Sequence, residues 1–347
     1  MKKRPARSLF DEHFRDQALE KINDVLPRLS RLVNWEAFRP EVEAHFPVRD
    51  PKKGGQPPYD RLMLFKAVVL MELYGLSAEA LEYQVNDRRS FQRFLGLQPQ
   101  HQVPDSTTVR LFVEHLTKAK AMEGLFASYH ARLSKAELVV NQGKIVDASM
   151  VHAPIQHNKR EDRELLENGE VPANWSARKK AQKDLDATWA KKNSKSYHGY
   201  KNHVKVDAQS KLIDHYVVTT ASVPDGEMAW ELLDERDEGQ DLYADKGYDW
   251  EDVKEGIALA KMEDRTHKKA RRNKPLTEQE EARNKELGRT RARVEHVFGS
   301  IHKQLHGLSV RCIGLRRATF RVGLTNLCYN LLRTLTLLSK RPAMGSV

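Results

Sequence analysis

Three acidic side chains stand in settings from which they could hold metal ions over a phosphodiester. Asp147 lies in GKIVDASMVHAP, Asp245 in DLYADKGYDW and Glu295 in RTRARVEHVFGSIHK. The first two follow short apolar runs typical of buried strands, and the third lies in a helix-like stretch. Carboxylates are oxygen ligands that suit Mg²⁺. Two such ions can stabilise the attacking and leaving oxygens of an in-line displacement, so we expect these acids to share a two-metal site.

Each strand acid also has a plain structural interpretation. A lone buried Asp147 is costly unless it is paired or metal-bound; the alternative is a turn cap beside Ser149, and the residues alone leave both open. A glycine two residues later permits a tight turn that places Asp245 at the carboxyl end of its strand, where open sheets build their sites. The adjacent Lys246 could contact a phosphate as a point charge. Asp249 is expected to cap the next helix.

Glu295 has the clearest helical geometry of the three. The apolar face beside it consists of Val294, Val297, Phe298, Ile301 and Leu305. Arg291, Glu295 and His302 form a neighbouring stripe at i, i+4 and i+11. From the edge of the packed face Glu295 can reach inward to a metal ion while Arg291 steadies it. The alternative is an ordinary surface ion pair, which contributes only about 0.2–0.5 kcal/mol.

The first part of the chain, residues 15–135, has the pattern of successive helices. DRLMLFKAVVLMELYG is so densely apolar that its helix must be buried, and Gly75 is expected to end it. Ser77 is expected to cap the next helix, and Asp105 or its neighbour a later one. Short helices joined by tight turns resemble a helix-turn-helix module, although any small helical bundle shows this pattern. The candidate DNA contacts in that module are Thr107, Thr108 and Arg110.

From residue 138 the pattern changes to strands. A polar insertion at residues 155–197 is expected to contain a helix over 176–191. We expect a mixed α/β fold, with a helical N-terminal domain (1–137), a mixed-sheet domain (138–340) and a short tail (341–347). The expected elements of the sheet domain are strands within 138–153, 203–223 and 240–245 and a helix over 224–233.

The order Asp, Asp, Glu and its flanking residues resemble the DDE transposases of bacterial insertion sequences, closest to the IS5 group of the IS4/IS5 superfamily. YADKGYD and the Arg291-x-x-x-Glu295 spacing carry most of this resemblance, which runs from about residue 30 to the C-terminus. It implies a DNA-binding N-terminal domain and an RNase H-like catalytic domain. It also implies two Mg²⁺ or Mn²⁺ ions, DNA cleavage and strand transfer, and a homodimer or larger assembly on double-stranded DNA, both terminal inverted repeats and target.

The sequence departs from the broader class at two positions of the third motif. A tyrosine that precedes the arginine there is Gly288 here, and a lysine seven residues after the glutamate is His302, with Lys303 one step further on. Either His302 or Lys303 could therefore take the phosphate-contacting role. The segment YHGYKNHVKVD resembles the family strand beside the first Asp. The residues expected there to line or brace the site are Tyr200, Lys201 and His203, with Lys201 a candidate DNA contact.

Composition favours a nucleic-acid partner. The 347 residues carry a net charge of +11, and the surplus gathers at residues 178–205, 265–274 and 311–321. Clustered cations are typical of a polyanion-binding surface, with a merely solvated cationic surface as the alternative. No segment has the apolar length of a membrane span and no secretory leader is apparent, so we expect a cytoplasmic, nucleoid-associated protein.

Other candidate sites are weaker. Cys312 and Cys328 lie in mostly apolar stretches and are expected in the core, not in a disulfide. Trp175 and Trp189 could stack on bases or anchor the insertion. Two further functions remain open: an RNase H-like nuclease without strand transfer, and a DNA-binding repressor with an inactive site. A zinc site is not expected, because no ligand spacing joins His152, His157, His198 and His203.

Overall fold

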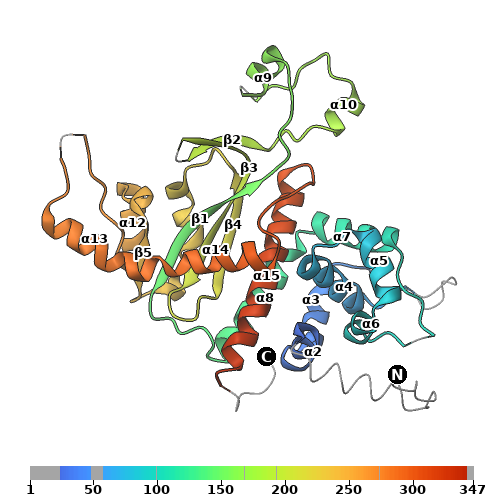
Figure 1. Ribbon diagram of the computed structural model, residues 1–347. Helices are drawn as coiled ribbons and strands as arrows, with labels where there is room; N and C mark the ends of the chain where they lie inside the picture. Colours follow the sequence, from blue (N-terminus) through green and yellow to red (C-terminus); the bar gives the residue numbers. More distant parts are fainter. Residues whose placement is uncertain are drawn as a thin grey trace, which may run out of the picture.

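The computed structural model describes residues 24–47, 58–98, 100–167, 169–192, 194–272 and 274–341. Helices make up the N-terminal part, a mixed sheet follows, and a long helix ends the described chain (Figure 1). The expected mixed α/β class with a helical N-terminal region is confirmed. No helix among the described residues is long and apolar enough to cross a membrane.

Helix ends in the N-terminal part follow local sequence signals. Gly75, at φ 62°, ends the largely buried α4, and the Ser77 side chain accepts a hydrogen bond from a first-turn amide of α5. Asp105 caps α7 in the same way, by accepting from the amide of Thr108 at 2.6 Å. All three expectations are confirmed. The N-terminal elements are α2 (Val25–Leu32), the 3₁₀ helix η1 (Trp35–Phe38), α3 (Arg39–Glu43), α4 (Arg61–Tyr74), α5 (Ala78–Asp87), α6 (Arg89–Leu95), α7 (Ser106–Lys118) and α8 (Ala121–Lys135).

The sheet combines antiparallel and parallel pairing around a central strand. Its strand order is β2-β3-β1-β5-β6, and β4 also pairs with β3. β1 pairs antiparallel with β3 and parallel with β5, and β5 pairs parallel with β6. Strands that are far apart in the sequence therefore lie next to each other at the centre. The strands are β1 (Lys144–His152), β2 (Thr188–Lys192), β3 (Lys195–Asp207), β4 (Ile213–Thr220), β5 (Asp241–Ala244) and β6 (Glu263–Asp264).

Helices cover both faces of the sheet. On one face, α11 (Ala229–Leu232) and α12 (Glu251–Leu259) pack against Val146 and Ala244. On the other face lie α14 (Arg293–Gln304) and the long α15 (Leu315–Leu338), with α13 (Glu278–Arg291) over β5. In Figure 1, α15 lies between the sheet and the N-terminal helices, and it contacts β4 as well as α4, α7 and α8. One continuous apolar cluster joins these helices to the sheet, and it includes the buried, unpaired Cys328.

The insertion differs from expectation. Strand structure starts at Lys144 rather than 138, and the helix expected over 176–191 is only α10 (Ala177–Ala181). The chain turns because the Asp184 side chain accepts hydrogen bonds from the amides of Asp186 and Ala187, both at 3.2 Å, and the segment has no apolar face to bury. A second short helix, α9 (Arg160–Glu167), lies earlier in the insertion. After α10 the chain extends the sheet as β2, residues 188–192. The helix expected over 224–233 is the 3₁₀ helix η2 (Asp225–Met228) followed by α11.

Candidate active site

Asp147 lies inside β1, and its carboxylate is buried. Oδ1 accepts a hydrogen bond from the amide of Ala148 at 2.8 Å, and Oδ2 pairs with Arg291 at 2.7 Å. Burial raises the pKa of Asp147 above its ordinary value, and the nearby Arg291 cation partly opposes that rise. The core-strand interpretation is confirmed and the turn cap beside Ser149 is wrong. A buried carboxylate whose charge is compensated by a cation is the setting expected of a metal ligand.

Asp245 follows directly after β5. Its side chain accepts the amide of Gly247 at 2.7 Å and caps the 3₁₀ helix η4 (Lys246–Tyr248). The parallel register puts Val146 opposite Ala244, so Asp147 and Asp245 are the next residues on neighbouring strands, which lie about 4.8 Å apart. Side chains alternate along a strand, and therefore both carboxylates lie on the face opposite the Val146–Ala244 contact. The expected strand-end position of Asp245 is confirmed.

Glu295 lies in the helical layer and is linked to Asp147 through Arg291. The expected single helix is broken at Ala292, so Arg291 ends α13 and Glu295 lies in the first turn of α14. The Arg291 guanidinium pairs with Glu295 Oε1 at 3.0 Å through Nη1 and with Asp147 Oδ2 at 2.7 Å through Nη2. The Asp147 side chain is 9% exposed and that of Glu295 62%, so the pair spans from the core to the surface.

The three acids fit a hard divalent cation by their chemistry. Their donors are all carboxylate oxygens, the ligands of Mg²⁺ and Mn²⁺. Among the described residues, however, no group of three His, Cys, Asp or Glu side chains lies close enough together to hold a metal ion. Arg291 lies between Asp147 and Glu295 and supplies the compensating positive charge. Arg291 would have to release both Asp147 and Glu295 for the two carboxylates to be free.

The predicted DNA contacts near the acids have different environments. Lys246 is exposed in η4, directly after Asp245, and His302 and Lys303 are exposed in the last turn of α14. They lie seven and eight residues beyond Glu295, about 10–12 Å along the helix. Lys201 has an internal role instead, because its ammonium pairs with Asp225 at 2.7 Å.

The sheet register places Lys201 on the face opposite Asp147. It pairs with Met150 across the β1–β3 ladder, three residues from Asp147, and so belongs to the opposite face. Its Nζ also donates to the carbonyl oxygen of Val223 at 2.7 Å, and only 8% of the residue is exposed. Buried and paired in this way, Lys201 is not available to contact DNA. The expected cap role of Asp249 is also wrong, because Trp250 precedes α12 and Asp249 accepts from the amide of Lys269 at 3.0 Å.

Two residues near the acids gave no clear signal as site residues in the sequence. Tyr248 is buried, and its hydroxyl has no hydrogen-bond partner among the described residues. Burial, with Asp225, Asp147 and Asp245 nearby, holds its pKa well above the usual value. His267 follows β6, and its amide donates to the carbonyl oxygen of Ala244 at 3.1 Å. Tyr248 belongs to YADKGYD, whereas His267 lies in a segment that stands out only by its basic charge.

The remaining candidates lie outside this site. Arg110, exposed on α7, pairs with Glu79 at 2.6 Å, beside the exposed Thr107 and the half-buried Thr108. Trp175 is 4% exposed and donates to Asp162 at 3.0 Å, so it packs within the insertion, and its anchoring of the insertion to the rest of the protein stays a prediction. Trp189 is 46% exposed on β2.

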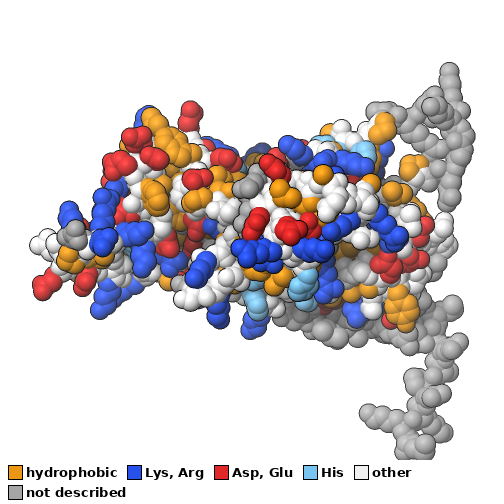
Figure 2. Space-filling view, turned by 90° about the horizontal axis from the view of Figure 1, so that it is seen from above, with side chains coloured by type: hydrophobic (Ala, Val, Ile, Leu, Met, Phe, Trp, Pro, Cys, Tyr) orange, Lys and Arg blue, Asp and Glu red, His pale blue; other side chains and the backbone are white. Residues whose placement is uncertain are grey.

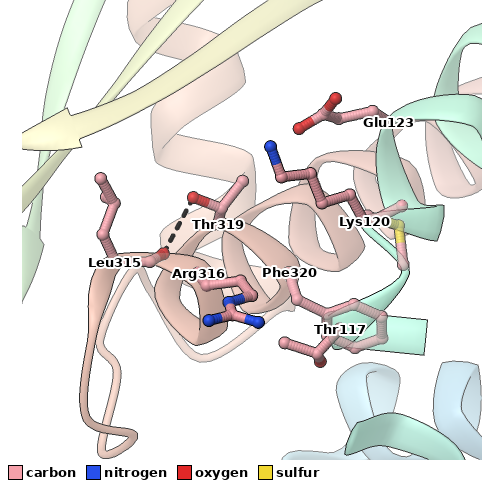
Figure 3. A pocket seen from close by; sticks show the side chains of 8 residues that line it. Thr117, Lys120, Glu123, Leu315, Arg316, Thr319 and Phe320 are labelled. Carbon is pink, nitrogen blue, oxygen red and sulfur yellow. Dashed lines mark hydrogen bonds between the residues drawn. The ribbon is translucent and has the colours of Figure 1, made fainter. Parts of the chain in front are cut away.

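A cavity away from the acids lies between the α7–α8 turn and the start of α15 (Figure 3). Its volume is about 240 Å³. Thr319 there donates to the carbonyl oxygen of Leu315 at 2.9 Å, within the first turns of α15. The labelled lining residues are Thr117, Lys120, Glu123, Leu315, Arg316, Thr319 and Phe320.

Two family models described as transposase domains match this chain. Residues 141–331 match the family model described as "Transposase DDE domain", and residues 14–115 match "Transposase domain (DUF772)". The transposase for insertion sequence element IS1106 of Neisseria meningitidis serogroup B is 32% identical over 195 residues, 56% of this chain and 66% of that relative. The chain thus matches slightly less than two thirds of the relative's length. A piggyBac transposase synaptic complex with hairpin DNA aligns with a TM-score of 0.46 and 10% identity, covering 94% of this chain and 75% of that one.

Proposed function

Because the chain belongs to the DDE transposase family, we propose that it binds the terminal inverted repeats of an insertion sequence and catalyses metal-dependent DNA cleavage and strand transfer. Asp147, Asp245 and Glu295 are the proposed catalytic and metal-binding residues. One observation carries this proposal. Asp147 and Asp245 lie side by side on neighbouring parallel strands, and Arg291 pairs with both Asp147 and Glu295. The IS5 grouping remains a prediction.

The domain assignment is part of the same proposal. The antiparallel β4-β3-β1 run followed by parallel β5 and β6 supports an RNase H-like catalytic domain over residues 138–340. The helices before it support a DNA-binding domain over residues 1–137, in which the start of α7 is the candidate reading surface. The two parts share one apolar core, so we expect them to act as a unit.

The chemistry divides between the ions and the side chains. Two bound Mg²⁺ or Mn²⁺ ions would supply an activated water and would stabilise the charge on the leaving oxygen. Asp147 and Asp245 hold one side of the site on the rigid sheet, and Glu295 completes it from α14. Once Arg291 releases Asp147, its guanidinium is free to bind a phosphate oxygen, for which its planar donors are well suited.

Exposed cations near the acids support DNA as the partner. Lys246 adjoins Asp245, and His302 and Lys303 lie further along α14. Figure 2 shows further Lys and Arg side chains at the end of the molecule formed by α13 and the segment before it. We call the exposed members of that segment the basic loop; they are Lys269, Arg271, Arg272 and Lys274. Because an insertion sequence has two ends, we propose a homodimer or larger assembly on DNA, acting in the cytoplasm at the nucleoid.

A strand-transfer assay tests the proposal. Purified protein is incubated with pre-cut terminal-repeat DNA, a plasmid target and Mg²⁺ or Mn²⁺. Covalently joined products are the expected result. Nicked DNA without joined products would indicate a nuclease that lacks strand transfer. A gel shift without cleavage or joining would indicate a DNA-binding repressor.

A further inference from the structure

His267 continues the row of residues formed by the two sheet acids. The β5–β6 register puts Leu242 opposite Asp264. The ladder runs on past β6, because the amide of Arg265 donates to the carbonyl oxygen of Leu242 at 2.9 Å and the amide of His267 donates to that of Ala244 at 3.1 Å. In this register His267 stands opposite Asp245, as Asp245 stands opposite Asp147. Three neighbouring parallel segments thus end in one row of polar residues.

The main chain around His267 is held on both sides. On one side it pairs with β5, as described above. On the other side Arg283 of α13 donates to the carbonyl oxygens of residues 266 and 264 at 2.8 and 3.0 Å. Asn284 exchanges two hydrogen bonds with the main chain of Lys268, at 2.9 and 3.0 Å. The position of His267 is therefore set by the sheet and α13 together, as a preorganised site requires.

The imidazole ring lies under α13 on the same side as the acids. A Cβ added to Gly288 would be 3.7 Å from Cε1 and 3.8 Å from Nε2 of His267, so the ring packs against the bare helix backbone three residues before Arg291. The charges that act on the ring are those of Arg291, Asp245 and Arg283. Its surroundings are thus those of the proposed active site.

Two nitrogen atoms in this place are buried without a hydrogen-bond partner in the described part of the chain. They are Nε2 of His267 and Nε of Arg291. Buried polar atoms are nearly always paired, and two neighbouring exceptions are expected where a ligand is missing. The guanidinium nitrogen can only donate, and Nε2 of His267 donates when it carries the imidazole proton, so a ligand that binds both atoms presents acceptor oxygens.

We propose that His267 is a further active-site residue whose Nε2–H donates to an oxygen of the scissile phosphodiester, beside Arg291. This inference rests on the proposed function and adds a phosphate-positioning residue to it. The competing explanation is that His267 only fills the space beneath α13. The two differ in one respect, because packing requires the ring volume and phosphate binding requires a polar atom at the place of Nε2.

Four variants separate these explanations. His267→Phe keeps an aromatic ring but has no polar atom, whereas His267→Gln brings an amide to about the reach of Nε2 and His267→Asn ends short of it. His296→Phe makes the same change at an exposed histidine of α14 and serves as the matched control. The variants are compared by single-turnover cleavage of a labelled terminal-repeat duplex in Mg²⁺, by the Kd for that duplex and by Tm.

The expected result is a loss of cleavage rate that follows polarity and reach. His267→Phe and His267→Asn should cleave about 10- to 100-fold more slowly, the range for loss of a hydrogen bond to a charged group, with Tm close to that of the native protein. His267→Gln should stay within a few-fold of the native rate, and His296→Phe should cleave normally. If His267→Phe does not fold, the comparison of His267→Gln with His267→Asn carries the test alone.

An Asp245→Asn variant keeps the two proposals apart. If it cleaves normally, the proposed function fails whatever His267 does. If Asp245→Asn is inactive but His267→Phe cleaves at the native rate, only the inference about His267 is overturned. Should His267→Phe not fold, His267→Asn takes its place in this comparison. His267→Gln as slow as His267→Asn would also overturn the inference, because the length of the polar side chain would then have no effect.

Discussion

Arg291 joins Asp147 to Glu295 through a single guanidinium, which lies 2.7 Å from Oδ2 of the first and 3.0 Å from Oε1 of the second. Asp147 and Arg291 are 144 positions apart in the sequence. The ion pairs link a buried strand carboxylate to an exposed helix carboxylate. The same cation lies between them, so we propose that Arg291 moves away from Asp147 when a metal ion binds.

Removal of any one acid should abolish cleavage but not DNA binding. Asp147→Asn, Asp245→Asn and Glu295→Gln each keep the side-chain size and remove a negative oxygen ligand, so we expect a loss of at least about 100-fold in rate. The Kd for terminal-repeat DNA should change little. Nicking assays and gel shifts measure both quantities, and near-native cleavage by a variant would remove that residue from the site.

Loss of Arg291 should affect metal binding and catalysis in opposite directions. Arg291→Ala removes a cation that competes for Asp147 and Glu295, so Mn²⁺ should bind about tenfold more tightly at pH 8 without DNA. Cleavage should nevertheless fall, because the phosphate loses a donor. Calorimetric titration with Mn²⁺ measures the affinity, with Arg291→Lys as the charge-preserving control. Weaker Mn²⁺ binding by the Ala variant would mean that Arg291 builds the metal site instead of occupying it.

DNA affinity should depend steeply on salt, in part through the basic loop. Each phosphate contact adds about 0.9 to the slope of log Kd against log salt concentration. Replacing Lys269, Arg271 and Arg272 together by Ala should reduce that slope by up to about 3. Lys261→Ala is the control, because its ammonium is already paired with Glu238 at 3.0 Å. An unchanged slope in the triple variant would exclude the basic loop from the DNA interface.

The insertion should loosen when its buried anchor is removed. The Tyr200 hydroxyl donates to the Asp184 carboxylate, 2.7 Å from each oxygen, and Asp184 is only 8% exposed. Tyr200→Phe leaves that carboxylate without this donor, which should reduce the free energy of unfolding by about 1–3 kcal/mol. Trypsin should then cut at the Arg and Lys residues 178–183 sooner than in the native protein. Tyr329→Phe, which loses a bond to the carbonyl oxygen of Lys211, should not change that cleavage pattern.

Acid should destabilise the protein through His203. Burial, assisted by Lys201, lowers the pKa of His203 from 6.5 to about 4. Between these values the unfolded chain binds a proton that the folded protein does not, so stability falls as pH decreases, by up to about 3 kcal/mol. His203→Gln removes this titration and should show a weaker decline. Urea unfolding at pH 7.0 and 4.5 measures the difference, and equal declines in both proteins would refute the prediction.

Local signals predicted the ends of elements well. Gly75, Ser77 and Asp105 act on amides or carbonyls within a few residues, and the structure has each helix boundary where the sequence predicts it. The same holds for Asp245, because a strand followed by a turn is a local pattern. The prediction of a helix over 176–191 was wrong because the end of this helix depends on a distant contact. The Asp184 side chain, which turns the chain there, is held by Tyr200 of β3.

By itself, the sequence determined the three acids, their local elements and the cationic character of the chain, because periodicity, capping and charge act between near neighbours. Only the tertiary structure decided which of these residues meet. The parallel register sets Asp147 beside Asp245, the same ladder brings His267 into their row, and alternation across β1 and β3 turns Lys201 to the other face. Arg291 then links sheet to helix. These relations depend on hydrogen-bond ladders and ion pairs between distant segments, and no short stretch of sequence encodes such pairings.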